Sequence, residues 1–142
     1  MIAIGSDHGG YKLKEEIKRY LEEKEIEYTD CGTFDEESVD YPEIAKTVAL
    51  EVQNRQCEKG IVICTTGIGI SIAANKVNGV RAALCTDSLC ARMTRLHNDA
   101  NVLALGANIV GPGLALEIVD VFLDTEFSGE ERHQRRIDLL EK

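Results

Sequence analysis

The 142-residue sequence lacks the features that mark membrane, secreted and nucleic-acid-binding proteins. No apolar run approaches the roughly 20 residues that a membrane-spanning helix requires. The N-terminal segment also lacks the charged and long apolar regions of a signal peptide. Acidic residues outnumber basic ones, 25 to 16, and no basic stripe is present. We therefore expect neither a membrane nor a nucleic-acid partner.

The sequence also lacks the cysteine and proline patterns of several other protein classes. Its five cysteines are an odd number, with no C-x-x-C pair and no zinc-type spacing, which predicts reduced thiols in a cytoplasmic protein. Only two prolines are present, and no low-complexity tract indicates a linker. With 44% hydrophobic and 29% charged residues, the chain is expected to form one domain over residues 1–142.

Short apolar segments alternate with helical patterns along the chain. The expected strands are 2–4, 26–29, 61–63, 81–84 and 102–105. The expected helices are 11–23, 41–52, 70–76, 88–96 and 114–123, followed by one more at the C-terminus. Strands separated by helices pair in parallel through right-handed crossovers. The sequence thus predicts an α/β fold, a Rossmann-like three-layer α/β/α sandwich with a five-stranded parallel sheet and an extra C-terminal helix.

The segment that most strongly indicates chemistry is 61–76, where an apolar strand ends in Cys64 and a Thr/Gly turn leads into a helix. Ligands of open α/β sheets bind at the carboxyl ends of strands, and the next helix directs its free N–H groups at them. The same surroundings favour a reactive thiolate. The alternative is that Cys64 is a small buried hydrophobic residue of the strand.

The turn does not match any of three better-known ligand-binding loop types. A dinucleotide fingerprint starting at Gly67 would need glycine where Ile72 stands, and a Walker loop would need a Gly-Lys-Ser/Thr ending. A cysteine phosphatase would need an arginine where Ile70 stands. The groups that remain are a thiol, two threonine hydroxyls and the backbone amides of residues 66–71. Such amides suit a developing oxyanion.

Asp7 and His8 follow the first strand. If the first and third strands are neighbours in the sheet, both residues lie at the same edge as Cys64. Asp7 also suits the N-cap of the next helix, which is a common use of aspartate. The adjacent imidazole is what favours contact with a ligand.

A basic cluster at residues 132–136 stands out in this acidic protein. Ser128 and Glu131 match an S-x-x-E capping box, so we expect the last helix to begin at Ser128. Arg132 and Arg136 then share one helix face, and their guanidinium groups suit a phosphate. The alternative is a set of surface ion pairs with Glu130, Glu131 and Asp138.

His97 precedes a strand, whereas Cys64 follows one. The two residues are therefore expected at opposite edges of the sheet. If both serve one reaction, His97 reaches the Cys64 site of another chain, which predicts an obligate dimer. The alternative is that His97 belongs to an ordinary C-terminal helix cap.

With these segments in place, the chain resembles the ribose-5-phosphate isomerase B family, within the group that also holds galactose-6-phosphate isomerase subunits. The resemblance runs from end to end and rests on residues 5–9, 40–42, 60–76, 79–82, 97–102 and 132–136. It implies metal-free interconversion of D-ribose 5-phosphate and D-ribulose 5-phosphate, with no cofactor. It also implies a homodimer with shared active sites, or a tetramer.

The resemblance implies specific roles for individual residues. Cys64 matches the base that moves a proton between C2 and C1, because the glutamate that some members use instead is Ile70 here. His97 matches the acid/base that opens the sugar ring, and Thr66 completes the catalytic set. The remaining residues matched to the substrate are Asp7, His8, Tyr41, Thr65, Gly67, Ile68, Gly69, Ile70, Ser71, Asn98, Asn108, Arg132 and Arg136. Among these, His8, Arg132 and Arg136 match phosphate contacts.

Two positions depart from the family pattern. Thr65 stands where glycine is usual, and glycine there suits a backbone angle that threonine tolerates poorly. The threonine side chain also removes space for the substrate. Asn108 replaces an arginine, so one phosphate contact is expected to be weaker or replaced. Two alternatives therefore stay open: an isomerase for allose 6-phosphate or another hexose phosphate, and a non-enzymatic sugar-phosphate-binding module.

Overall fold

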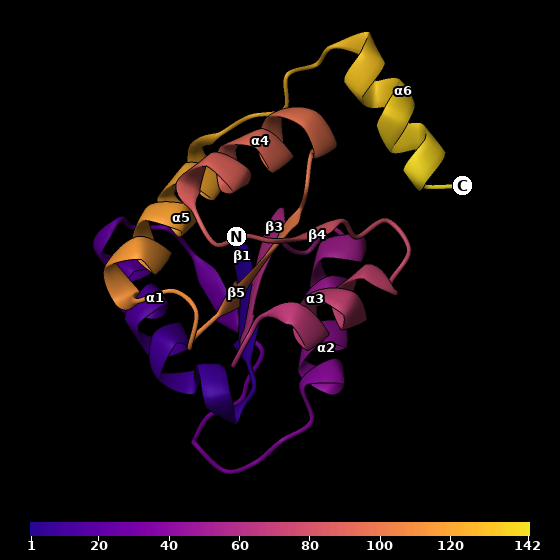
Figure 1. The fold of residues 1–142 in the computed structure, drawn as a ribbon. Coiled ribbons are helices and arrows are strands. Elements are labelled where there is room, and N and C mark those ends of the chain that lie inside the picture. The colour runs from indigo at the N-terminus through magenta and orange to yellow at the C-terminus, as the bar shows by residue number, and fades with distance from the viewer.

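The computed structural model describes residues 1–142, in which strands and helices alternate (Figure 1). The strands are β1 (Ile2–Ser6), β2 (Tyr28–Asp30), β3 (Lys59–Cys64), β4 (Ala82–Leu84) and β5 (Val102–Gly106). The α-helices are α1 (Tyr11–Glu23), α2 (Tyr41–Gln53), α3 (Ile68–Asn75), α4 (Ser88–Asn98), α5 (Pro112–Asp124) and α6 (Glu131–Leu140), and a short 3₁₀ helix, η1 (His8–Gly10), precedes α1. None of these helices has the length and apolar character needed to cross a membrane.

The five strands form one parallel sheet in the order β2-β1-β3-β5-β4. β1, β3 and β5 are buried over nearly their whole length, as expected for strands covered on both faces. One core cluster joins the sheet to α1 and α5, and a second joins it to α2 and α3 on the other face (Figure 1). The predicted three-layer α/β/α sandwich is confirmed.

The extra C-terminal helix is also confirmed, but its predicted start is wrong. α6 begins at Glu131 rather than at Ser128, and its N-cap residue, Glu130, makes no side-chain capping bond. The Ser128 hydroxyl accepts the N–H of Glu130 at 3.2 Å and shares a 2.6 Å hydrogen bond with Nδ1 of His133. Because the hydroxyl is used in this way, the capping box does not form.

A buried ion pair fixes the chain where β2 ends. The Lys14 side chain is fully buried, and its Nζ lies 2.6 and 2.7 Å from the carboxylate oxygens of Asp30 and 2.6 Å from the carbonyl oxygen of Thr33. Lys18 also bonds Asp30, at 2.8 Å. Burial alone would raise the pKa of Asp30, but its bonds to Lys14, Lys18 and the Gly32 N–H give a net lowering.

We predict that Lys14→Met destabilises the fold by about 3 kcal/mol, because it leaves a partly buried carboxylate with one cation instead of two. Lys18→Met is the matched control, since Lys18 is partly exposed and its loss should cost about 1 kcal/mol or less. Urea denaturation of the two variants and the wild type measures both effects. Equal losses would mean that burial of Lys14 does not matter.

Candidate active site

Cys64 ends β3 at the carboxyl edge of the sheet. Its strand lies between β1 and β5, with Ile63 opposite Ser6 and Cys64 opposite Gly106. The prediction that the first and third strands are neighbours is therefore confirmed. Cys64 is 6% exposed, and its Sγ accepts the N–H of Gly67 at 3.1 Å.

The turn after Cys64 requires glycine at position 67. Gly67 has a φ of 78°, and a Cβ there would lie 2.6 Å from the Leu84 side chain and 2.8 Å from the Leu105 backbone. Thr65 has no positive φ. The expectation that position 65 needs a glycine backbone angle is therefore wrong, because the left-handed residue of the turn is two positions further along.

The backbone amides of this turn are divided between internal and free groups. Gly67 donates to Cys64 and Ser71 donates to the Gly67 carbonyl, while the Ile68 N–H has a 3.3 Å bond to Oγ1 of Thr66. The N–H groups of Thr66, Gly69 and Ile70 have no partner in the chain. The oxyanion cradle expected over residues 66–71 thus retains three free amides, of which those of Gly69 and Ile70 lie in the first turn of α3. The side chain of Ile70 is fully buried, so only its backbone faces a ligand.

Tyr41 lies directly against this cradle. A Cβ at Gly69 would lie 2.6 to 2.8 Å from the Tyr41 ring and its hydroxyl, so the absence of a side chain lets the ring approach α3. Tyr41 begins α2 and is 39% exposed. The structure therefore brings the phenol beside the first turn of α3, and contact of Tyr41 with the substrate stays a prediction.

Asp7 and His8 lie at the same edge. The Asp7 N–H donates to the Ile63 carbonyl at 3.2 Å, and its carboxylate accepts the Gly10 N–H at 3.1 Å. Asp7 is therefore an N-cap, as in the alternative interpretation, while it also lies beside β3. The Val39 N–H donates to Nδ1 of His8 at 3.2 Å, which leaves Nε2 of the exposed ring as the hydrogen-bond donor.

Thr65 and Asn108 border the cradle. A Cβ at Gly9 would lie 2.3 Å from Oγ1 of Thr65. The exposed threonine side chain therefore fills the space next to Gly9, in the turn that follows β1. The Asn108 N–H donates to the Thr65 carbonyl at 2.9 Å, and the Asn108 side chain is exposed. Both departures from the family pattern therefore lie at the carboxyl edge with Cys64.

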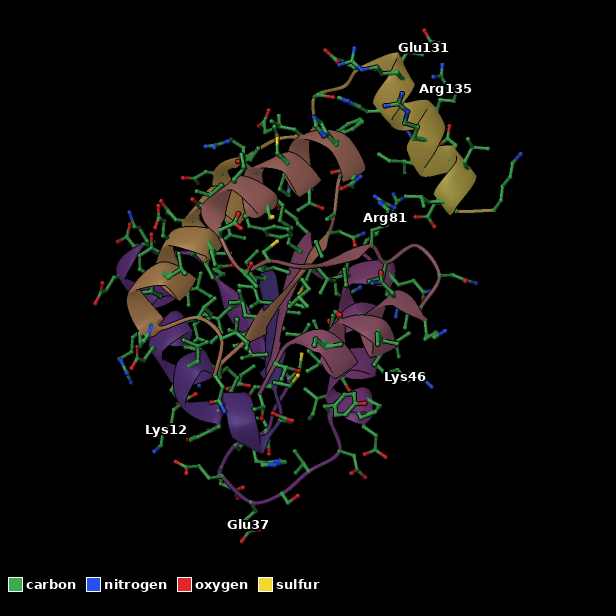
Figure 2. All side chains as sticks on the ribbon, in the orientation of Figure 1. Lys12, Glu37, Lys46, Arg81, Glu131 and Arg135 are labelled. Carbon is green, nitrogen blue, oxygen red and sulfur yellow. The ribbon has the colours of Figure 1, made fainter.

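Four predicted site residues lie elsewhere. His97 and Asn98 end α4, which leads into the amino end of β5, and Arg132 and Arg136 lie on α6. α6 lies against the end of α4, at the end of the molecule opposite the loop that carries Glu37 (Figures 1 and 2). A single chain therefore does not bring these four residues to Cys64. Arg132 pairs with Glu130 at 2.8 Å, whereas Arg136 makes no ion pair within the chain.

A family model described as ribose/galactose isomerase matches residues 2–140 of this chain. The chain belongs to the ribose/galactose isomerase family. It is 50% identical to ribose-5-P isomerase B of Listeria innocua over 141 residues, covering 99% of this chain and 95% of the relative. It also resembles the solved ribose-5-phosphate isomerase B of Clostridium thermocellum (56% identity, TM-score 0.97, 99% and 94% covered) and that of Mycoplasma genitalium with bound ribulose 5-phosphate (42%, 0.93, 99% and 93%).

The sequence pattern did not predict that His133 is buried against His97. His133 is 6% exposed, and its ring lies 4.4 Å from that of His97, centroid to centroid, at 38° between the planes. Burial, with the charges of His97 and Arg132 nearby, lowers the pKa of the His133 imidazole from its ordinary value. The spacing of His133 and Ile137 is the feature of the sequence that could have predicted this burial. Positions four apart share a helix face, and these two are the buried residues of α6.

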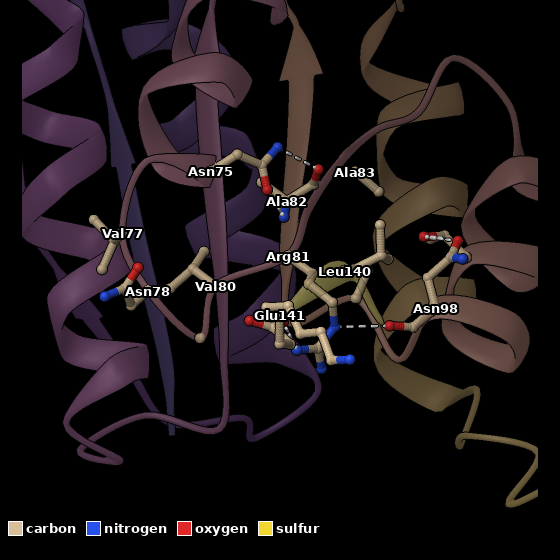
Figure 3. Close-up of a pocket in the computed structure, with 14 residues that line it drawn as sticks. Asn75, Val77, Asn78, Val80, Arg81, Ala82, Ala83, Asn98, Leu140 and Glu141 are labelled. Atoms are coloured by element: carbon tan, nitrogen blue, oxygen red, sulfur yellow. Dashed lines mark hydrogen bonds and ion pairs between the residues drawn. The ribbon is translucent and has the colours of Figure 1, made fainter. Parts of the chain in front are cut away.

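A cavity of about 840 Å³ lies away from Cys64. It is bordered by the α3–β4 connection, the end of α4 and the end of α6, with Asn75, Asn98 and Leu140 among its lining residues (Figure 3). Arg81 and Glu141 pair across it at 2.5 Å. No group of three or more His, Cys, Asp or Glu side chains is arranged to hold a metal ion.

Proposed function

We propose that this chain is an aldose–ketose isomerase that interconverts D-ribose 5-phosphate and D-ribulose 5-phosphate. The observation that carries the proposal is the position of Cys64, whose thiol is hydrogen-bonded to Gly67 beside the free amides of Gly69 and Ile70. One turn thus offers a base and a cradle for an oxyanion, which are the two requirements of proton transfer next to a carbonyl. Membership of the family supports the choice of a sugar phosphate.

In the proposed mechanism, the Cys64 thiolate removes the proton from C2 of the open-chain aldose and returns it to C1, while the hydroxyl proton of O2 moves to O1. The cis-enediolate between these steps carries negative charge on oxygen. The N–H groups of Gly69 and Ile70 stabilise that charge, and each such donor typically contributes about 3 kcal/mol. The Thr66 hydroxyl, exposed on the same turn, polarises the same oxygens.

The proposed site is completed by a second copy of the chain. Cys64 and His8 lie at the carboxyl edge, whereas His97, Arg132 and Arg136 lie at the other end of the molecule. We assign ring opening to His97 of the second copy and phosphate binding to its two arginines together with His8. The proposal thus includes a homodimer with shared sites, as such or within a tetramer.

The direct test is the initial rate of the purified protein, in EDTA, with D-ribose 5-phosphate and D-allose 6-phosphate in parallel. The proposal expects turnover of ribose 5-phosphate and a lower kcat/KM for allose 6-phosphate. The reverse preference would make the protein a hexose-phosphate isomerase, which the description of the family as ribose/galactose isomerase also accommodates. Saturable binding without proton exchange at C2 would make it a binding module.

Thr65 is expected to restrict the sugar, because its side chain projects at the edge of the cradle beside Gly9. We predict that Thr65→Gly raises the ratio of kcat/KM for allose 6-phosphate to that for ribose 5-phosphate by about tenfold, the usual worth of a small steric difference. Thr65→Ser, which keeps the hydroxyl, is the matched control. An unchanged ratio in Thr65→Gly would remove Thr65 from the determinants of specificity.

Arg136 is expected to bind phosphate, since it is exposed on α6 and unpaired within the chain. We predict that Arg136→Ala raises KM for ribose 5-phosphate by about tenfold or more while kcat stays within a few-fold, because a hydrogen bond to a charged group is lost. Arg135→Ala is the control: Arg135 is also exposed on α6 but is one position out of register (Figure 2). Equal KM values for the two variants would contradict the assignment.

The same proposal treats residues 1–142 as one sugar-phosphate isomerase domain. The sheet and both of its flanking layers use elements from the whole chain, from β1 to α5. It also assigns the protein to the cytoplasm, where thiols stay reduced, because all five cysteines are free.

A further inference from the structure

The basic cluster of α6 contains a histidine for which the proposed mechanism has no role. His133 is buried, whereas Arg132 and Arg136 on the same helix are exposed. A histidine buried on a surface helix gives up hydration that a leucine would not need. Packing of α6 alone therefore does not explain why a histidine stands at this position.

The contacts of His133 form a closed loop around the last turn of α4. Its ring contacts that of His97 at 4.4 Å between centroids, with the planes tilted by 38°, and its Nδ1 shares a 2.6 Å hydrogen bond with the Ser128 hydroxyl. Ser128 in turn donates its N–H to the carbonyl of Leu96, the neighbour of His97, at 3.2 Å. The ring that contacts His97 is thus held by a residue anchored to the backbone beside His97.

Two arginines, Arg95 and Arg81, fix the segments on either side of these contacts. Arg95 donates to the Thr125 carbonyl at 2.9 Å, which ties the segment before Ser128 to α4. Arg81 donates to the Asn98 carbonyl at 2.8 Å and pairs with Glu141 at 2.5 Å, which ties the far end of α6 to the end of α4. α6 is therefore fixed at both ends relative to His97, which is itself exposed.

We propose that His133 is a positioning residue that holds the exposed imidazole of His97 in the orientation needed for ring opening. The contact between the two rings restricts the His97 ring, and the hydrogen bond to Ser128 fixes the plane of the His133 ring. This role rests on the proposed function, in which His97 is the acid/base that acts on a sugar bound to the second copy. The charged and titratable groups that face His133 are His97, Arg132, Glu130 and Arg136.

The test uses His133→Leu, which keeps the position apolar, and His133→Phe, which keeps a flat ring against His97. We expect His133→Leu to lower kcat for ribose 5-phosphate by about tenfold or more with KM changed less than threefold, because misorientation of a reacting group is costly. His133→Phe should retain most of the lost activity. Ile137→Ala is the control, since it loosens the other buried contact of α6 without removing a contact of His97.

A kinetic isotope effect separates positioning from partial misfolding. When ring opening becomes slow, proton abstraction no longer limits the rate, so the effect on kcat with D-[2-²H]ribose 5-phosphate should be close to one in His133→Leu. Loss of folded enzyme alone would leave the isotope effect at its wild-type value. An isotope effect well above one in His133→Leu, an unchanged kcat, or the same loss of kcat in Ile137→Ala overturns the proposal.

A measurement without turnover distinguishes failure of this inference from failure of the proposed function. The chain has three histidines, so ¹³C relaxation of labelled imidazole rings resolves His97 from His8. We expect the His97 ring to be ordered in the wild type and in His133→Phe and mobile in His133→Leu, with His8 unchanged. If the wild type shows no isomerase activity but this pattern holds, the proposed function fails and the contact role stands. Equal order of the His97 ring in all three proteins overturns the inference.

Discussion

Cys64→Ala is expected to lower kcat for ribose 5-phosphate by about 10²- to 10⁴-fold, the usual contribution of a well-placed general base. Cys64 is the only titratable side chain on the turn that also presents the free amides of Gly69 and Ile70. The position six residues further on offers no substitute base, because Ile70 is apolar and buried. KM should change little, since the phosphate contacts are untouched.

The control for this variant is Cys90→Ala. Cys90 is an exposed thiol on α4 whose pKa is raised by its hydrogen bond to Asp87. The buried Cys85 is less suitable, because burial raises its pKa to about 12 and its removal would leave a hole in the core. Cys90→Ala should keep wild-type rates. A loss of less than tenfold in Cys64→Ala would end its assignment as the base.

The sheet could be predicted from sequence most reliably where strands are buried on both faces. β1, β3 and β5 each contain a continuous apolar run, which is the segment expected for that strand. β2 is an edge strand of three residues, and it lies at Tyr28–Asp30 instead of 26–29. Its last residue is the charged partner of buried Lys14, and this long-range ion pair leaves no trace in hydrophobic periodicity.

The candidate site also has features that the sequence could predict and features that it could not. Topology alone predicted that Cys64, Asp7 and His8 meet at one edge and that His97 lies at the other, because strand ends in a parallel sheet have fixed sides. The distribution of the amides in the turn depends on local geometry that spacing does not encode, as when Cys64 takes the Gly67 N–H. The contact of His133 with His97 depends on how α6 docks on α4, which no single helix pattern specifies.

Mixing two inactive variants should restore activity, and this is the sharpest test of the shared site. In a dimer of one Cys64→Ala and one His97→Asn chain, one site combines both mutations and the other combines wild-type Cys64 with wild-type His97. Random pairing of equal amounts makes half of the dimers mixed, and each has one intact site of two. We therefore expect about a quarter of wild-type activity, given two-fold symmetry.

The result depends on the separation that the structure shows between the carboxyl edge, with Cys64, and the α4–α6 end, with His97 and Arg132. If each chain completed its own site, every site in the mixture would carry a mutation and no activity would return. A matched control mixes His97→Asn with Arg132→Ala, two changes at the same end. Both sites of that mixed dimer are defective, so its activity should not exceed the average of the two parents. Restoration by the first pair alone requires that the α4–α6 end of one chain acts on the Cys64 edge of another.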